Sequence, residues 1–98
     1  METNKKNQLQ ILDFWAPKCR ACENLGLFLD QLREKYGDAF ELIKINAREY
    51  EEERLKFRVM NVPTLIFLKD GDLVFRNVGF DNDIKQVIEN EIMNHLPR

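Results

Sequence analysis

The segment Leu9–Phe14 restricts the fold most, because its bulky apolar side chains fall on both faces of an extended chain. A strand of this kind is buried on both sides, like the central strands of sheets that helices cover on two faces. The chain has 98 residues, of which 44% are hydrophobic and 33% are charged. This length provides one domain with a modest core, so we expect a layered α/β fold built from short elements.

A helix is predicted directly after this strand. Trp15–Lys18 interrupts the extended pattern, and from Cys19 onward apolar residues recur at helical spacing until Gly37 ends the segment. Gly26, inside this helix, weakens it by about 1 kcal/mol relative to alanine. The apolar positions of the predicted helix are Cys22, Leu25, Phe28, Leu29, Leu32 and Tyr36.

Three more strands and two more helices are predicted downstream. The strands are Phe40–Ile45, Pro63–Leu68 and Leu73–Val78, and the helices run from Glu49 to about Phe57 and onward from Asp81–Asp83. Lys69–Asp72 is typical of a hairpin turn. The order is therefore β-α-β-α-β-β-α, with the first two strands parallel and the last two antiparallel in a mixed sheet. The last helix should bury an apolar face formed by Ile84, Val87, Ile88, Ile92 and Leu96.

Cys19 and Cys22 are the two cysteines of the chain, and they form a C-x-x-C motif at the predicted strand-to-helix junction. The nucleophile in thiol–disulfide exchange is the thiolate, which the free N–H groups and the dipole of a helix N-terminus stabilise. Cys22 lies one turn inward on the same helical face, within reach of Cys19. Lys18 and Arg20 add two positive charges beside Cys19, which favours a redox-active pair.

Other uses of the cysteine pair are less consistent with the sequence. A zinc site usually has four ligands, and beyond the pair the chain offers only His95, so no metal site is predicted. A buried structural pair is the second alternative, but Pro17, Lys18 and Arg20 indicate that the motif is exposed. An iron–sulfur cluster shared across a dimer is the third.

Charge and hydropathy exclude several classes of partner. The formal net charge is -2 with both signs interspersed, so there is no basic stripe for nucleic acid and no polybasic tail for a membrane. No apolar stretch approaches the roughly 20 residues of a membrane span, and Met1–Gln8 has no signal-peptide character. We expect a cytoplasmic monomer with a single domain over residues 1–98, in which residues 1–8 form a short or flexible N-terminal segment.

The sequence around the cysteines resembles that of the thioredoxin family. Asp13–Cys22 (D-F-W-A-P-K-C-R-A-C) is similar to the family's D-F-W-A-x-W-C-G-P-C, and Val62–Thr64 is similar to its I/V-P-T. Leu68–Gly71 resembles the family's F-K-N-G hairpin, and Val78–Gly79 resembles its late V-G. The similarity runs from Leu9 to the last helix with matching order and spacing.

The resemblance implies a minimal thioredoxin fold and a thiol–disulfide oxidoreductase that reduces or exchanges protein disulfides through Cys19 and Cys22. It implies no cofactor besides this dithiol, and the chain carries no nucleotide or flavin fingerprint. A separate electron donor, such as a thioredoxin reductase, would restore the dithiol. The alternatives are a glutathione-dependent, glutaredoxin-like protein and a thioredoxin-fold binding module whose cysteines act as a redox latch.

The resemblance also implies a role for Asp13 as a buried acid behind the disulfide, with Lys44 as its neighbour. A carboxyl group inside a strand buried on both faces should have a raised pKa, which suits it to accept the proton of Cys22. The alternatives are a solvated aspartate at the strand end and an ordinary surface lysine. Trp15 is expected to pack beside the cysteine pair.

By the same resemblance, Pro63 follows a cis peptide bond and faces the cysteines. This bond would leave the Val62 backbone free to pair with an extended substrate peptide. Phe80 is expected either as an exposed apolar contact on the same rim or as a core residue. The predicted substrate-binding residues are Trp15, Lys18, Arg20, Val62, Gly79 and Phe80.

Several positions depart from the family pattern. Lys18 replaces the tryptophan before the first cysteine, and Arg20–Ala21 replaces Gly-Pro within the motif. Leu27 stands where the family has the kink proline of the helix, and Asn61 stands two places before Pro63, where the family has glycine. Only Met1–Gln8 is available for the family's additional N-terminal strand and helix, so we expect a four-stranded core.

Overall fold

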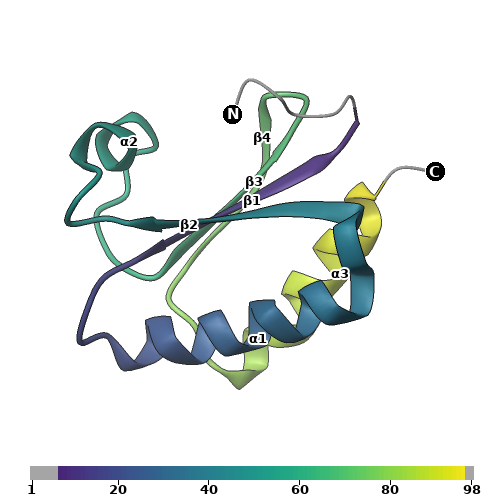
Figure 1. Ribbon diagram of the computed structural model, residues 1–98, viewed down its shortest axis with the longest axis horizontal. Helices are drawn as coiled ribbons and strands as arrows, with labels where there is room; N and C mark the ends of the chain where they lie inside the picture. Colours follow the sequence, from purple (N-terminus) through teal and green to yellow (C-terminus); the bar gives the residue numbers. More distant parts are fainter. Residues whose placement is uncertain (1–6, 97–98) are drawn as a thin grey trace.

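The computed structural model describes residues 7–96, which form a four-stranded mixed sheet flanked by helices (Figure 1). The strands are β1 (Leu9–Trp15), β2 (Phe40–Asn46), β3 (Thr64–Lys69) and β4 (Asp72–Val78). The helices are α1 (Arg20–Tyr36), α2 (Glu51–Lys56) and α3 (Lys85–His95), with 3-10 turns at Gly37–Ala39 and Asn82–Ile84. The predicted element order and the α/β class are confirmed. Residues 1–6 of the predicted N-terminal segment lie outside the described residues.

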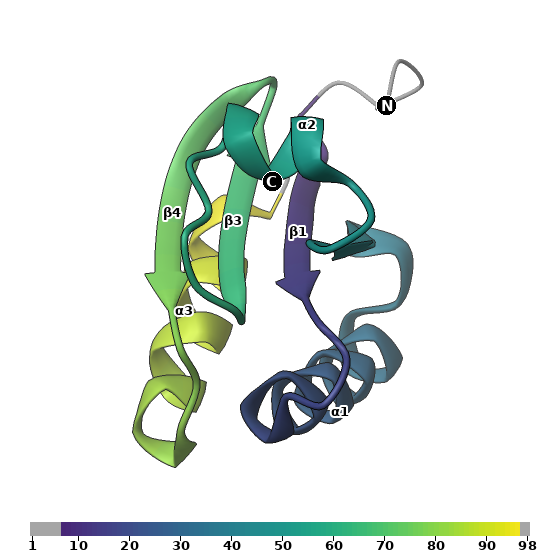
Figure 2. The ribbon, with the colours of Figure 1, turned by 90° about the vertical axis from the view of Figure 1, so that its left-hand side faces the viewer.

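Strand β1 is central, as its sequence predicts. The strand order is β2-β1-β3-β4, with β1 parallel to β2 and antiparallel to β3, and with β4 antiparallel to β3. One face of β1 places Leu9 and Ile11 in a core cluster with residues of α1 and α3. The other face places Leu12 and Phe14 in a second cluster, on the side of the sheet where α2 lies (Figures 1 and 2). Both faces of β1 are therefore covered.

Helix α1 forms because an N-cap residue and a C-terminal glycine bound a segment whose apolar residues recur at helical spacing. Cys19 is its N-cap residue, and Gly37 ends it with a φ of 60°, in the left-handed region that glycine adopts at no steric cost. The helix thus begins one residue after the predicted start. Its buried side chains, at helical spacing, are Cys22, Leu25, Leu29 and Leu32. Burial of each leucine contributes roughly 1.5–3 kcal/mol, which fixes α1 against the sheet.

One predicted core residue is misplaced. Val87 is 43% exposed, whereas Ile88 and Ile92 are fully buried. Because a helix turns by about 100° per residue, Val87 is rotated away from the face that Ile88 and Ile92 present to the sheet. Ile84, which lies in the preceding 3-10 turn, and Leu96 pack against the same core as half-buried side chains.

Several element boundaries differ by one or two residues from the prediction, and two of these differences have a clear physical reason. Strand β3 begins at Thr64 and not at Pro63, because proline has no N–H to donate to a sheet ladder. Helix α2 is shorter than predicted: the N–H groups of Glu49 and Tyr50 both donate to the Asn46 carbonyl at 3.0 Å, which holds them in a turn before the helix.

Within residues 7–96, the helices are too short or too polar to cross a membrane.

The position of Gly26 predicts a stabilising substitution. A Cβ atom built on Gly26 would lie 3.9 Å from Lys44 Nζ, an ordinary van der Waals distance, and the helix is regular there. Gly26→Ala should therefore raise the free energy of unfolding by about 0.5–1 kcal/mol, through reduced backbone freedom in the unfolded chain. Urea unfolding at pH 7 measures this change; an unchanged or lower stability would show that the site does not tolerate a side chain.

Candidate active site

Cys19 and Cys22 form a disulfide at the start of α1, with their Cα atoms 5.2 Å apart. Lys18 precedes them with a φ of 59°, and this left-handed residue turns the chain from the end of β1 into the helix. The N–H of Cys22 donates to Cys19 Sγ at 3.2 Å, so the sulfur of Cys19 occupies the capping position. Cys22 is only 5% exposed, whereas Cys19 is half-buried. Attack from solvent is therefore easier at Cys19.

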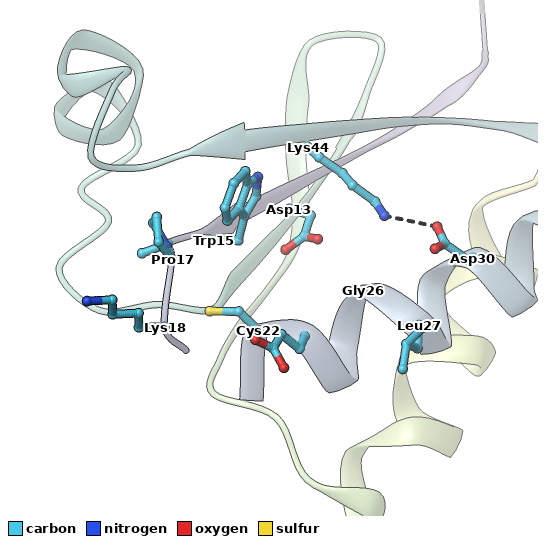
Figure 3. Close-up of a pocket in the computed structure, with 11 residues that line it drawn as sticks. Asp13, Trp15, Pro17, Lys18, Cys22, Gly26, Leu27, Asp30 and Lys44 are labelled. Carbon is cyan, nitrogen blue, oxygen red and sulfur yellow. Dashed lines mark hydrogen bonds and ion pairs between the residues drawn. The ribbon is translucent and has the colours of Figure 1, made fainter. Parts of the chain in front are cut away.

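A pocket of about 520 Å³ lies behind the disulfide, between the sheet and α1 (Figure 3). Asp13, Trp15 and Lys44 reach it from the strands, and Cys22 reaches it from the helix. Together with Lys18, these make five residues that the sequence predicts for the site and that line one cavity. The lining residues that the sequence did not predict are Ala16, Pro17, Glu23, Gly26, Leu27 and Asp30.

Asp13 is a buried carboxylic acid that lines this pocket. Its residue exposure is 2%, and its Oδ1 atom has no hydrogen-bond partner within residues 7–96. Burial raises the pKa of this carboxyl group to about 6; the positive charge of Lys44 lowers it and the negative charge of Asp30 raises it, both by less. A carboxyl group with this pKa can exchange a proton near neutral pH.

Lys44 lies directly opposite Asp13 in the parallel register of β1 and β2. Its ammonium group does not bind Asp13: Nζ forms an ion pair with Asp30 Oδ1 at 2.9 Å, drawn as a dashed line in Figure 3. Sequence reasoning missed Asp30. A usable signal existed, because Cys22, Gly26 and Asp30 are spaced four residues apart and so share one face of α1.

The other predicted site residues lie outside the pocket lining. The Val62–Pro63 peptide bond is cis, as the family resemblance implies. Thr64 pairs with Phe14, so Val62 and Pro63 lie at the end of the sheet from which the cysteine loop leaves β1. Arg20 is exposed at the first position of α1.

Gly79 and Phe80 follow β4 at this same end of the sheet. The N–H of Gly79 donates to the Pro63 carbonyl at 2.8 Å, which ties the two segments together. Phe80 is half-buried and stacks on Phe28 of α1 with ring centroids 5.8 Å apart, so it contributes to the core. In the described part of the chain, no cluster of three or more His, Cys, Asp or Glu residues is arranged to hold a metal ion.

Comparison with known proteins points to one family. The thioredoxin family model matches residues 1–92. A thioredoxin of Bacillus subtilis is 37% identical over 86 residues, which cover 88% of this chain and 81% of that protein. A thioredoxin of Staphylococcus saprophyticus is 32% identical over 93 residues, covering 93% of this chain and 89% of that protein.

Solved structures give the same result. A thioredoxin of Fasciola hepatica superposes with a TM-score of 0.82 at 29% identity, over 92% of this chain and 83% of that one. A thioredoxin of Nicotiana alata superposes with a TM-score of 0.84 at 30% identity, over 95% of this chain and 77% of that one.

The raised pKa of Asp13 predicts how stability depends on pH. Because the folded-state pKa is about 6 and the ordinary value is 3.8, the unfolded chain loses this proton first as the pH rises. This group therefore lowers the free energy of unfolding progressively between about pH 4 and pH 6, by up to roughly 3 kcal/mol. Asp13→Asn should remove that loss and stabilise the oxidised protein at pH 7 by about 1–3 kcal/mol.

Urea unfolding of both proteins at pH 4, 5, 6 and 7, without reductant, measures this difference. The gain from Asp13→Asn should grow with pH and level off above pH 6. A gain that is the same at every pH would contradict the assigned ionisation.

Proposed function

The chain belongs to the thioredoxin family and is a thiol–disulfide oxidoreductase, and we propose that Cys19 is its attacking thiolate and Cys22 its resolving thiol. The observation that carries this assignment is the asymmetry of the pair. The Cys19 sulfur caps the N-terminus of α1 and is partly accessible, whereas Cys22 is buried beside the pocket that contains Asp13.

The proposed reaction proceeds in two exchanges. The Cys19 thiolate attacks one sulfur of a substrate disulfide, forms a mixed disulfide and releases the other substrate sulfur as a thiolate. The Asp13 carboxylate then accepts the Cys22 proton, directly or through water in the pocket. The Cys22 thiolate attacks the Cys19 sulfur, closes the Cys19–Cys22 disulfide and releases the second substrate thiolate. Two electrons pass to the substrate, and an external donor returns them.

Helix α1 contributes to the first exchange through its N-terminus. The Cys22 N–H that donates to the Cys19 sulfur would bind the thiolate more strongly than the neutral thiol, and the helix dipole acts in the same direction. Lys18 and Arg20 are both exposed next to Cys19 and add positive charge. These interactions favour the reduced form of the pair relative to its disulfide.

Proteins of this family act on protein disulfides and draw electrons from a reductase. For this chain we propose protein disulfide substrates and a thioredoxin reductase as the donor. An extended substrate strand would pair with the Val62 backbone, while Trp15, Lys18 and Arg20 contact its flanking side chains. Gly79 and Phe80 border this surface. No cofactor beyond the dithiol is needed for this chemistry. The proposed role of Lys44 is to lower the pKa of Asp13 through its positive charge.

We further propose that residues 1–98 act as one monomeric domain in the cytoplasm. The bacterial thioredoxins support the thioredoxin interpretation over a glutathione-dependent one. Turnover of insulin disulfides with dithiothreitol tests the proposed activity. The wild type should accelerate insulin precipitation, and Cys19→Ser should abolish the acceleration. Turnover that depends on glutathione alone would favour the glutaredoxin-like alternative instead.

The roles of the two cysteines can be separated by labelling. Brief treatment of the reduced protein with iodoacetamide, followed by peptide mapping, should label Cys19 before Cys22, because Cys22 is 5% exposed. Cys22→Ser should accumulate mixed disulfides through Cys19 when it is mixed with a disulfide substrate, since the resolving thiol is absent. Preferential labelling of Cys22 in the wild type would reverse the assignment.

The local charge predicts the redox potential. Exposed charges contribute weakly, by about 0.2–1 kcal/mol each, and 1.4 kcal/mol corresponds to about 30 mV for a two-electron couple. We therefore expect a potential about 10–30 mV less negative than the ~−270 mV of thioredoxin. Arg20→Gln should shift the potential to more negative values in a glutathione titration, whereas Arg20→Lys, which keeps the charge, should not. Equal potentials for all three proteins would show that this charge does not set the potential.

A further inference from the structure

Lys44 is placed to pair with Asp13 but pairs elsewhere. The two residues are directly opposite each other in adjacent parallel strands, so their side chains leave the same face of the sheet. Asp13 Oδ1 has no hydrogen-bond partner in the part of the chain that the structure describes. The Lys44 ammonium nevertheless lies 2.9 Å from Asp30 Oδ1, across the pocket on α1. A buried carboxyl group thus stays unpaired while a cation on the neighbouring strand is held by another acid.

We propose that Asp30 is a positioning residue: it anchors the Lys44 ammonium at the helix side of the pocket and so keeps this cation from pairing with the Asp13 carboxyl group. The inference rests on the proposed role of Asp13 for its functional meaning, but not for its geometry. Its consequence is that Asp13 remains basic enough to accept the Cys22 proton, because a paired carboxylate is a weaker base.

A small residue at position 26 leaves room for the Lys44–Asp30 ion pair. A Cβ atom at Gly26 would lie 3.9 Å from Lys44 Nζ, so the ammonium group passes over the helix at this residue before it reaches Asp30, one turn further on. Figure 3 shows the same path, with Gly26 on the helix below the extended Lys44 side chain. A long side chain at position 26 would occupy the space through which Lys44 crosses.

The charges around Asp13 agree with this geometry. Leu65, opposite Asp13 on β3, brings no charge to it. Burial raises the pKa of Asp13 most; Lys44 lowers it, and Asp30 raises it again. The charged and titratable residues that line the pocket around Asp13 are Lys18, Cys22, Glu23, Asp30 and Lys44.

The expected effect is modest because the ion pair is exposed. The side chains of Lys44 and Asp30 are 41% and 59% exposed, and exposed ion pairs are weak. Removing the Asp30 charge should free Lys44 to approach Asp13 and lower the Asp13 titration midpoint by about half a pH unit.

The test is a carbon-13 NMR titration of the Asp13 carboxyl group in the oxidised 98-residue chain, from pH 4 to pH 8. In the disulfide form neither cysteine ionises, so no thiol titration disturbs the Asp13 signal. The wild-type midpoint should lie near 6. Asp30→Asn should lower it by about half a unit, and Asp30→Glu should restore it. Glu23→Gln is the matched control, because it removes another carboxylate from the same pocket and should shift the midpoint less than half as far.

A second comparison shows whether Asp30 acts through Lys44. In a Lys44→Met background, Asp30→Asn should move the midpoint much less than it does in the wild type. An unchanged or raised midpoint in Asp30→Asn, an equal shift in Glu23→Gln, or an equal shift in both backgrounds would overturn the inference. Asp30→Asn is also compared with the wild type in the pH profile of insulin turnover. If the variant lowers the Asp13 midpoint but leaves the acid limb of this profile unmoved, the placement of Lys44 is supported and the proposed role of Asp13 is contradicted.

Discussion

The burial of one carboxyl group, that of Asp13, is the constraint on which the site depends. Desolvation is the largest influence on its pKa, because β1 is covered on both faces and α1 closes over the side of the sheet that Asp13 faces. The fold tolerates this cost at a position where an apolar residue would carry no such desolvation penalty. As a result of its burial, the Asp13 carboxyl group changes protonation near neutral pH, in the pocket behind Cys22.

The same strand-to-helix junction places the two halves of the chemistry. Strand β1 delivers Asp13 to the pocket, and the loop that follows it delivers Cys19 to the N-terminus of α1, where free N–H groups and the helix dipole favour a thiolate. Helix α1 then carries Cys22 and Asp30 on one face. In the proposed reaction, sulfur attack at Cys19 and proton release at Cys22 are thus separated by one helical turn. Lys18 and Arg20, which are both exposed, replace common family residues and change the charge of the surface beside Cys19.

Much of this could be predicted because the determining patterns are local. The two-faced apolar pattern of Leu9–Phe14, the helical spacing after Cys19 and the hairpin turn at Lys69–Asp72 gave the element order, and the burial of Asp13 followed from its strand. Helical spacing alone places Asp30 on the same face of α1 as Cys22, but its pairing with Lys44 depends on how α1 lies across β2, which no local pattern contains. The predicted burial of Val87 was wrong for a related reason. A short helix with several apolar residues has more than one possible buried face, and only packing selects between them.

The central claim, that Asp13 accepts the Cys22 proton, is tested most directly by the rate at which a mixed disulfide on Cys19 is resolved. Trp15 is the single tryptophan of the chain and lines the pocket, so its fluorescence reports the step in a stopped-flow experiment. The account predicts a wild-type rate that falls as the pH drops through the Asp13 midpoint near 6, and a slower rate without this inflection in Asp13→Asn. Identical rates and pH profiles for the two proteins would contradict it.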